Sequence, residues 1–507
     1  MRAKASSVLR RLPAVLLAVI AAGGARSLPP APRTLRVCDD VSDPAGLDPH
    51  YSFDDKSADI LDQIYEGLVR IDANGKVAPA LAAGWRRVDD RSVRFFLRAG
   101  VRFQDGEPFD AAAAAASLRR EFAAPAPPAA LFSDVVEARA EGRYVLLVRT
   151  RGPDDLLLRR LAQFAPIVPP SLSRRSGPLP PDAAPVGTGP YEFVRWIRGR
   201  EIVLAANPGY WRGRAPYDRV VFRFIRAGNQ VPALIRGDLD LLTDVPAPLI
   251  RSVARAPGLR VLKVRSLLTD AFWFTSLRGP LEDVRVRRAL NYAVDKSRLI
   301  REASGGDGVP IATLSMPGEF GHDARLAPYP YDPARARRLL RDAGYARGFT
   351  LRLLAVAQSA RDAREIQADL RRVGVRLETT VVPISEGYQI AAEGALRRYD
   401  INANVAPDPI GHMGFLASVC FSSASALSAG GLPGFDARYR RMEEARGAAS
   451  ERRRAERLDD WIYRQAPAIF TYQRVRAYGL RRGVAFAPRR DGMLVLAARR
   501  PDAGGAR

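Results

Sequence analysis

The stretch RFQDGEPFDAAAAAASLRR, residues 102–120, joins a turn to a long run of alanines. Its Asp105-Gly106 pair is a turn dipeptide, because aspartate bonds to its own backbone and glycine readily adopts left-handed conformations. Asp110 directly precedes the alanines, where an aspartate caps the first turn of a helix. The stretch therefore predicts the end of a β-meander, a turn and a capped helix, with Leu118 as a larger apolar contact of that helix.

The same stretch holds three carboxylates, Asp105, Glu107 and Asp110, which also raise the question of acid chemistry. A calcium loop needs oxygen ligands at alternating positions and a closing glutamate further on, and no such glutamate follows. A pair of carboxylates can also serve a hydrolase. An exported enzyme that uses Asp105 and Glu107 therefore stays open as an alternative, although the turn and the cap explain the aspartates without chemistry.

Composition limits the class of protein. The chain has 507 residues, of which 47% are hydrophobic, so it is long enough for two or three globular domains. Its formal net charge is +24, and nearly all of the positive charge is arginine, since lysine occurs at only five positions. The arginines are scattered, and no basic block alternates with stacking aromatics as a nucleic-acid groove requires. We therefore predict no nucleic-acid partner.

The N-terminus has the pattern of an export signal. Basic residues precede an apolar run from Leu12 to Ala22, and small residues follow it, so we expect cleavage after Ala25 and a signal peptide over residues 1–25. The apolar run is shorter than the roughly 20 residues that span a bilayer. No cysteine directly follows the run, which argues against a lipid anchor. The pattern predicts an exported, soluble protein.

Two cysteines occur, Cys38 and Cys420. An oxidising compartment allows them to pair, and the alternative is two separate buried thiols. Their spacing matches no metal-binding motif. We predict a disulfide between Cys38 and Cys420.

Hydrophobic periodicity predicts strands in the first half of the chain and a mixed pattern in the second. Alternating apolar residues indicate strands and hairpins between residues 93 and 205. Further on, Asp283 and Asp332 each stand where a helix is expected to begin. A strand, a helix and a second strand are predicted over residues 349–382, which indicates an α/β fold.

The chain carries few residues suited to catalysis or metal binding. Histidine occurs three times, and neither a zinc-type cluster nor the G-x-S-x-G motif of serine hydrolases is present. The glycines of PVGTGPY, residues 185–191, lack the Lys-Ser/Thr of a phosphate loop and lead into a strand. The sequence therefore predicts a protein that is not an enzyme, with no catalytic residue, no metal site and no cofactor.

A series of short motifs runs along the chain in order. They are LDPHYSFDD from Leu47, IYEGLVRIDANGKVAPALAAGW from Ile64, FFLRAGVRFQDGEPFDA from Phe95, PVGTGPYEF from Pro185, NPGYW from Asn207, ALIRGDLDLL from Ala233, DVRVRRALNYAVDKSRLI from Asp283, YDPARARRLLRDAGY from Tyr331 and IQADLRRVGV from Ile366. In this order they resemble the bacterial extracellular solute-binding proteins of family 5, the dipeptide, oligopeptide and nickel type that feed ABC importers. GEPFDA and NYAVDKSRLI resemble the nickel-binding branch in particular.

The resemblance implies an α/β, two-lobed periplasmic-binding-protein fold of type II, similar to cluster C, with a hinge and an extra subdomain in the first lobe. We expect the first lobe to comprise residues 33–70, 185–265 and 470–500, with the subdomain at 71–184. The second lobe is expected at 266–469. The solute is expected to lie between the lobes, which close over it by a hinge motion.

The resemblance also implies a function. We expect a monomeric periplasmic receptor that delivers a small solute, such as a peptide or a metal chelate, to the permease subunits of an ABC importer at the membrane. A non-transport sensor or interaction protein on the same fold is a further alternative. By position, the ligand-binding residues are expected to be Tyr51, Phe53, Trp273, Phe274, Asp408, His412 and Met413.

The pockets of the peptide and nickel branches are not intact in this sequence. The arginines and aromatics that hold a metal chelate in the nickel branch do not carry over, since residues 123–132, after the alanine helix, contain no arginine or tryptophan. Peptide-binding relatives place an aspartate for the peptide amine shortly before an Asp-Pro pair, and here residues 404–407 hold no aspartate. Asp408, within the pair itself, is the residue placed to substitute.

Overall fold

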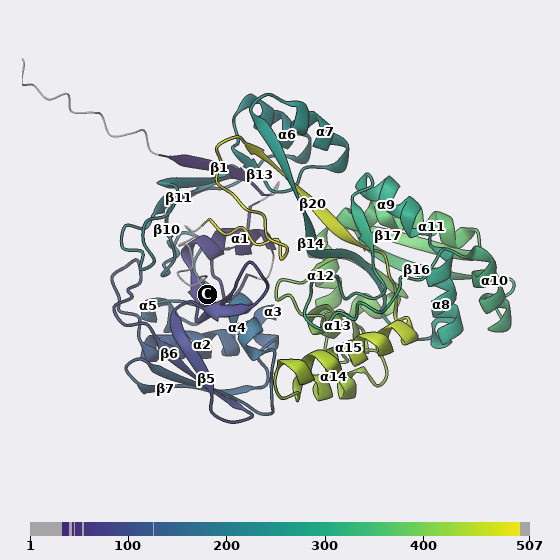
Figure 1. Ribbon diagram of the computed structural model, residues 1–507, viewed down its shortest axis with the longest axis horizontal. Helices are drawn as coiled ribbons and strands as arrows, with labels where there is room; N and C mark the ends of the chain where they lie inside the picture. Colours follow the sequence, from purple (N-terminus) through teal and green to yellow (C-terminus); the bar gives the residue numbers. More distant parts are fainter. Residues whose placement is uncertain (1–32, 40–42, 45, 53–54, 125, 497–507) are drawn as a thin grey trace, which may run out of the picture.

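Two lobes lie side by side in the computed structural model, the first at the purple and blue end of the chain and the second in green (Figure 1). The expected signal peptide and Phe53 lie outside the described residues. Within those residues, no helix combines the length and the apolar character needed to cross a membrane. The described residues are 33–39, 43–44, 46–52, 55–124 and 126–496.

One large sheet extends through both lobes. Short strands β15 (Gly308–Pro310) and β19 (Ala468–Ile469) lie beside it, paired with β20 and β14. In spatial order its strands are β10 (Tyr191–Ile197), β11 (Glu201–Ala206), β12 (Arg219–Arg223), β1 (Thr34–Cys38), β13 (Leu241–Leu242), β20 (Tyr472–Arg481), β14 (Leu259–Phe274), β18 (Ile401–Pro407), β16 (Phe349–Val356) and β17 (Val375–Val382).

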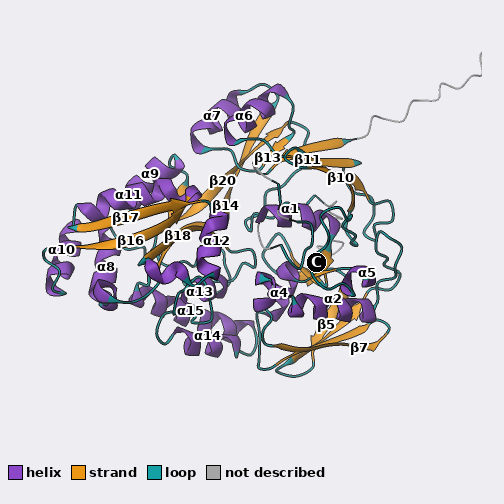
Figure 2. Ribbon diagram, turned by 180° about the vertical axis from the view of Figure 1, so that it is seen from behind, coloured by secondary structure: helices purple, strands orange, loops and turns teal. Residues whose placement is uncertain are grey.

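Strands β14 and β20 carry this sheet from the first lobe into the second (Figure 2). They are antiparallel, their pairing begins at Leu259 opposite Arg481, and its register shifts between Arg265 and Thr269. A register shift of this kind bends a strand pair and increases its local twist. The shift lies where the pairing of β14 with β18 begins, at Leu268 opposite Pro407.

The first lobe packs helices against its part of the sheet, around buried Val37, Tyr191 and Phe222. One of the hairpins expected between residues 93 and 205 is confirmed as the antiparallel pair of β10 and β11. The helices of this lobe are α1 (Asp55–Ile64), α5 (Pro170–Ser173), α6 (Ala227–Arg236) and α7 (Ile250–Arg255), with a 3₁₀ turn at Ala247–Leu249.

Two sequence motifs of the first lobe meet at the end of α1. A Cβ atom on Gly187 would lie 2.0 Å from Ile64 O, so only glycine allows this close approach of two backbones. Nearby, Glu66 accepts hydrogen bonds from Tyr210 Oη at 2.9 Å and from Trp211 Nε1 at 2.7 Å. The glycine-rich motif and the NPGYW motif therefore have a structural role in holding the first lobe together.

A four-stranded antiparallel sheet with α2 packed against it forms the subdomain of the first lobe. The predicted turn is confirmed, since Gly106 has a φ of 87° and Glu107 N donates to Asp105 Oδ1 at 2.9 Å. The predicted cap is confirmed as well, because Asp110 Oδ1 accepts from Ala113 N at 2.9 Å. The sheet runs in the order β5 (Ala82–Arg87), β6 (Ser92–Leu97), β8 (Val145–Thr150) and β7 (Val135–Gly142), beside α2 (Ala111–Ala123), α3 (Pro127–Ala130), α4 (Leu157–Phe164), the pair β2 (Glu66–Gly67) and β9 (Pro166–Ile167), and the pair β3 (Val69–Ile71) and β4 (Val77–Pro79).

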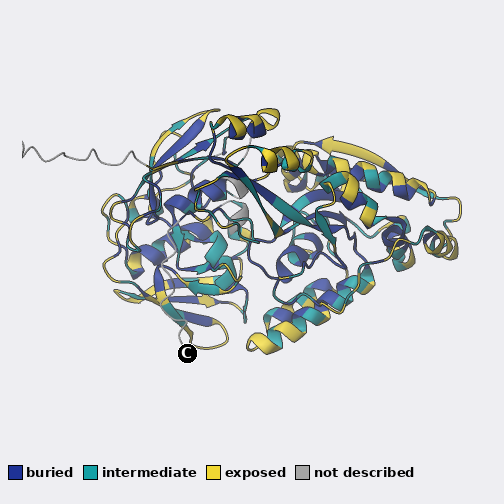
Figure 3. Cartoon of the chain, turned by 45° about the horizontal axis from the view of Figure 1, so that its top comes forward, coloured by how far each residue is buried: buried dark blue, intermediate teal, exposed yellow. Residues whose placement is uncertain are grey.

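The second lobe surrounds β14, β18, β16 and β17 with helices whose exposed faces point outward (Figure 3). Asp283 Oδ1 accepts from Arg285 N at 2.7 Å and Asp332 Oδ1 from Arg335 N at 2.8 Å, so both predicted helix starts are confirmed. The helices are α8 (Val284–Ala293), α9 (Lys296–Ser304), α10 (Pro333–Asp342), α11 (Ala360–Arg371), α12 (Ile384–Ala392), α13 (Gly414–Phe421), α14 (Phe435–Glu443) and α15 (Ala448–Gln465), with 3₁₀ turns at Gly279–Glu282, Ala357–Ser359 and Ala395–Arg398.

The predicted disulfide is not formed. Cys38 lies on β1 in an apolar cluster of the first lobe, whereas Cys420 lies on α13 in the main core of the second, and no disulfide joins these two described residues. Burial raises the pKa of the Cys420 thiol. Two separate buried thiols, the alternative interpretation, describe the structure.

Candidate functional site

The lobes contact each other through α4 of the first lobe. Leu156, just before this helix, is 2% exposed and belongs to the apolar core of the second lobe. At the other end of the helix, Phe164 stacks on Phe415 of α13, with ring centroids 5.6 Å apart. Further out, Arg446 Nη2 lies 2.6 Å from Asp90 Oδ2. These contacts describe a closed arrangement of the lobes.

Arg159 on α4 crosses the boundary between the lobes. Its Nη1 donates to Gly75 O of the first lobe at 2.9 Å and to Ile410 O of the second lobe at 2.7 Å. Its guanidinium lies 5.7 Å from the centroid of the Phe320 ring, and that of Arg452 lies 4.6 Å from the same centroid. Burial lowers the pKa of Arg159, but arginine stays protonated in proteins. A positive charge is therefore held between the lobes.

Asp408 organises the loop that Arg159 contacts. Its side chain is fully buried, and Oδ1 accepts from Ile410 N and Gly411 N, each at 3.0 Å. Oδ2 accepts from His412 N at 2.7 Å. Burial raises the pKa of the Asp408 carboxyl to about 7. In this arrangement the carboxyl binds its own loop, and none of it is exposed to a solute.

Glu319 lies directly beside Asp408. Its Oε2 accepts from Met316 N at 3.0 Å, and its Oε1 has no hydrogen-bond donor among the described residues. Burial, reinforced by the negative charge of Asp408, raises the pKa of Glu319 well above its usual range.

His412 and Met413 follow in the same loop. The His412 ring is fully buried and stacks on Phe320, with centroids 5.3 Å apart. Its Nδ1 accepts from Gly414 N at 3.0 Å, which places the ring proton on Nε2, 3.2 Å from Glu451 Oε1. Burial lowers the pKa of His412. Met413 is 2% exposed and belongs to the apolar core of the second lobe, so neither side chain is exposed to a solute in this structure.

Trp273 and Phe274, at the end of β14, lie in the core of the second lobe. They are 2% and 5% exposed, and Trp273 Nε1 donates to Leu427 O at 2.8 Å. On the sheet, Trp273 is paired with Asn402 of β18. Both side chains therefore pack in the core of the second lobe.

Tyr51 lies in the first lobe, half-buried, with the Arg120 guanidinium 5.4 Å from its ring centroid. Arg120 in turn forms a buried two-pronged pair with Asp48, at 3.1 Å between Nη1 and Oδ1 and 2.6 Å between Nη2 and Oδ2. This ion pair joins the LDPHYSF segment, which contains Tyr51, to the end of α2.

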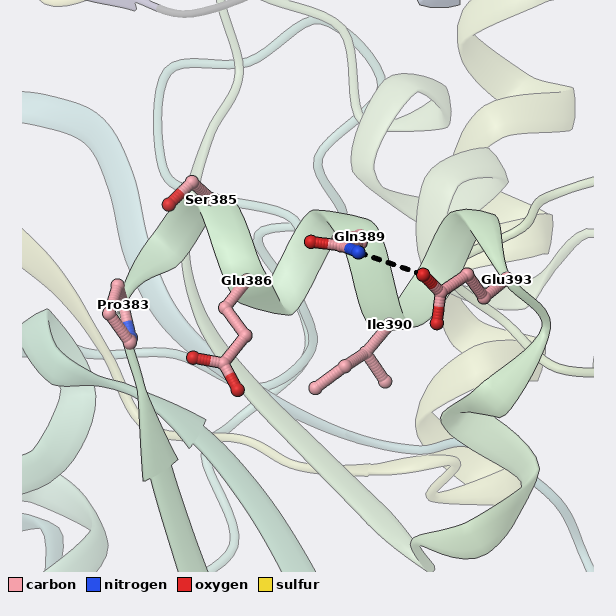
Figure 4. A pocket seen from close by; sticks show the side chains of 6 residues that line it. All are labelled: Pro383, Ser385, Glu386, Gln389, Ile390 and Glu393. Atoms are coloured by element: carbon pink, nitrogen blue, oxygen red, sulfur yellow. Dashed lines mark hydrogen bonds between the residues drawn. The ribbon is translucent and has the colours of Figure 1, made fainter.

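A hollow of about 450 Å³ lies on the surface of the second lobe along α12 (Figure 4). Within it Gln389 Nε2 donates to Glu393 Oε1 at 2.9 Å. All of its lining side chains come from α12 and the residues directly before and after it, so the hollow is a groove on one helix. They are Pro383, Ser385, Glu386, Gln389, Ile390 and Glu393.

Asp408, His412 and Met413 lie in one loop because they are close in the sequence, and sequence reasoning missed the residues that this loop contacts. Arg159 and Glu319 come from distant parts of the chain and stand in no recognisable motif. Across the described residues, no group of three or more His, Cys, Asp or Glu side chains is placed to hold a metal ion.

The comparison with known families decides the identity of this fold. The model of the bacterial extracellular solute-binding proteins, family 5 middle region, matches residues 76–419. The chain belongs to family 5 of the bacterial extracellular solute-binding proteins. Family 5 proteins are solute-binding components of ABC transporters and are not enzymes, so the alternative of an enzyme built on Asp105 and Glu107 is set aside.

Individual relatives of this family 5 protein agree with the assignment. The glutathione-binding protein GsiB of Salmonella typhimurium is 28% identical over 349 residues, which cover 66% of this chain and 67% of the relative. The GsiB of Escherichia coli K12 is 27% identical over 350 residues.

Solved structures confirm the expected fold, an α/β, two-lobed periplasmic-binding-protein fold like cluster C. The binding protein AgaA of A. tumefaciens R10, in complex with agropinic acid, is 26% identical, has a TM-score of 0.79, and the match covers 89% of this chain and 94% of that chain. NikA of Brucella suis, in complex with Fe(III)-EDTA, shares the fold with a TM-score of 0.79 at 24% identity, over 90% of this chain and 98% of that one.

Proposed function

We propose that this family 5 protein is a periplasmic receptor that binds a small, carboxylate-bearing solute between its lobes and delivers it to the permease subunits of an ABC importer. The observation that carries the proposal is the closed contact between the lobes, with the charged group of Arg159 held in it. A cleft that closes from both sides desolvates a small solute and strengthens each polar contact with it.

The solute class is supported by the relatives that exceed a quarter identity. They bind glutathione and agropinic acid by their names, and both compounds carry carboxylate groups. The chain's net charge of +24 favours anionic solutes electrostatically. The motifs that resemble the nickel-binding branch keep metal chelates among the solutes to be tested.

The solute site is proposed to lie between Tyr51 and the backbone of the loop from Asp408 to Met413, because the side chains of Asp408, His412 and Met413 are buried in this structure. The lobes are proposed to have the ranges expected from the sequence. Tyr51 supports this because it is half-buried and held in place by Arg120. The loop supports it because α4 reaches it across the lobe boundary. Trp273 and Phe274 contribute only through packing in the core of the second lobe, at the other end of the β14–β18 pairing from this loop.

The test is native mass spectrometry of the protein purified from its own host, followed by thermal melts with glutathione, dipeptides, an opine and nickel–histidine chelates. A bound solute at a hundredfold excess over its Kd stabilises the protein by about 2.7 kcal/mol. Tyr51→Ala should weaken binding of the active compound, whereas Tyr144→Ala, which removes another tyrosine beside an arginine, should not. If none of these compounds shifts the melt, the proposed solute class is wrong.

A further inference from the structure

We propose that a hollow between α7 of the first lobe and α11 of the second binds a small tetrahedral dianion, such as phosphate or sulfate. The hollow shares no residue with the solute site proposed above, which comprises Tyr51 and the loop from Asp408 to Met413. The proposal therefore goes beyond the receptor function and does not depend on it.

Both lobes build this hollow, which has a volume of about 270 Å³. On one side, Arg251 lies on α7, directly after the 3₁₀ turn that contains Ala247. On the other side, Arg361 is the second residue of α11. A Cβ atom on Gly305, the C-cap of α9, would lie 3.0 Å from Ala247 Cβ, so the two sides of the hollow are in contact. The lining residues are Ala247, Pro248, Arg251, Gly305 and Arg361.

The two arginines of the hollow are available to a ligand. Arg251 and Arg361 are both exposed, and neither has an ion pair or a hydrogen bond within the described residues. A guanidinium is always charged in proteins, and its planar fork of N–H donors matches the oxygens of a phosphate group. Two positive charges that face one hollow repel each other. An anion between them removes this repulsion and accepts hydrogen bonds from both.

The protein does not supply this anion itself. In the part of the chain that the structure describes, no acidic side chain lines the hollow. Asp307 is paired with Lys263 at 2.6 Å, and Asp362 is buried. Asp244 and Glu302 are exposed, and neither belongs to the lining. The positive charge of the hollow is therefore left to an ion from solution.

Size and charge select the class of anion. Pockets for drug-sized ligands have volumes of roughly 300–1,000 Å³, so a hollow of about 270 Å³ suits a smaller molecule. Two arginines together neutralise two negative charges, whereas a monocarboxylate would leave one of them uncompensated. Because one arginine comes from each lobe, a dianion bound here joins the lobes at this face of the molecule.

The experiment is isothermal titration of the whole protein, without solute, at pH 8 and constant ionic strength in chloride. Inorganic phosphate, sulfate and acetate are the three probes. Phosphate or sulfate should bind at one site, and acetate should not bind measurably. Arg251→Gln and Arg361→Gln should each weaken binding of the dianion by roughly tenfold, because each removes charge-assisted hydrogen bonds to it.

Two matched controls lie on the same helices. Arg255 is one turn after Arg251 on α7, and Arg364 is three residues after Arg361 on α11. Both are exposed, and neither lines the hollow. Arg255→Gln and Arg364→Gln remove the same charge from the protein and should keep the wild-type affinity. Since all four positions are exposed, circular dichroism should show that all four variants fold, and either member of the test pair decides alone if the other does not.

Three results overturn the anion site. The first is a wild-type protein that binds neither phosphate nor sulfate saturably at millimolar concentration. The second is an equal loss of affinity in the test variants and the controls, which would show that net charge alone attracts the anion. The third is acetate binding as tight as that of the dianions. Each result leaves the proposed solute class untouched, because the titrations contain no solute.

Discussion

Phe164 of the first lobe and Phe415 of the second stack with 20° between their ring planes, although the chain passes through the hinge between them. Stacked aromatic pairs contribute about 1 kcal/mol beyond the area that they bury. Because the two rings come from different lobes, we expect their contact to favour closure.

Phe164→Ala should therefore weaken solute binding by roughly fivefold, which corresponds to about 1 kcal/mol. Isothermal titration with the solute found by mass spectrometry measures the change. Phe122→Ala is the control, because Phe122 pairs with Phe132 within the subdomain, at 5.0 Å between centroids. It should lower the melting temperature and leave affinity unchanged; equal losses of affinity in both variants contradict the assignment.

Removing the cap of α2 should destabilise the subdomain. Asp110→Ala leaves Ala113 N without its partner and should lower the free energy of unfolding by about 1 kcal/mol. Asp110→Asn keeps an acceptor and should retain most of the stability. Urea unfolding followed by circular dichroism compares the two variants, and similar losses in both would show that the cap contributes little.

The buried pair of Arg120 and Asp48 should be sensitive to the loss of one partner. Arg120→Ala leaves the Asp48 carboxylate without its two-pronged donor and should cost about 3–5 kcal/mol in unfolding free energy. Arg214→Ala, which breaks an exposed pair with Asp218, should change stability far less. Chemical denaturation measures both, and equal effects are incompatible with the importance of burial here.

Stability should depend on pH through Glu121. Burial, with Asp48 nearby, raises the pKa of its carboxyl to about 9. The folded protein therefore retains a proton that the unfolded chain releases above roughly pH 4. This contribution to stability is complete below that value and is lost as the pH rises through about 9. Glu121→Gln should flatten the decline of unfolding free energy between pH 5 and 9, and exposed Glu302→Gln should leave the decline as steep as in the wild type.

Local chemistry explains why some features were predictable. The turn at Asp105 and the caps at Asp110, Asp283 and Asp332 each depend on residues two or three positions away, and all four have the expected hydrogen bonds. The family motifs also predicted the fold, because they occur in the same order as in the family and are spread over most of the chain.

The site was less accessible to sequence reasoning. Arg159 donates a hydrogen bond to Ile410 O, 251 positions away in the chain, and no sequence motif at either residue predicts this contact. Aromatic residues look the same whether they face a cleft or a core, so Trp273 was a reasonable candidate although it packs in the core here. The disulfide was wrong because two cysteines in an exported chain fix no distance between them, and these two lie in different lobes.

Strand β14 has 16 residues and pairs with strands of both lobes, while β20 runs beside it. Separating the two lobes into independent chains would therefore remove β14 or β20 from its partner strands. The exposed strand edge would carry unpaired backbone groups, and such edges promote aggregation. The protein should accordingly melt in a single transition, and circular permutation should succeed only at surface loops away from these two strands. The strands that allow the lobes to move are the same ones that make them one folding unit.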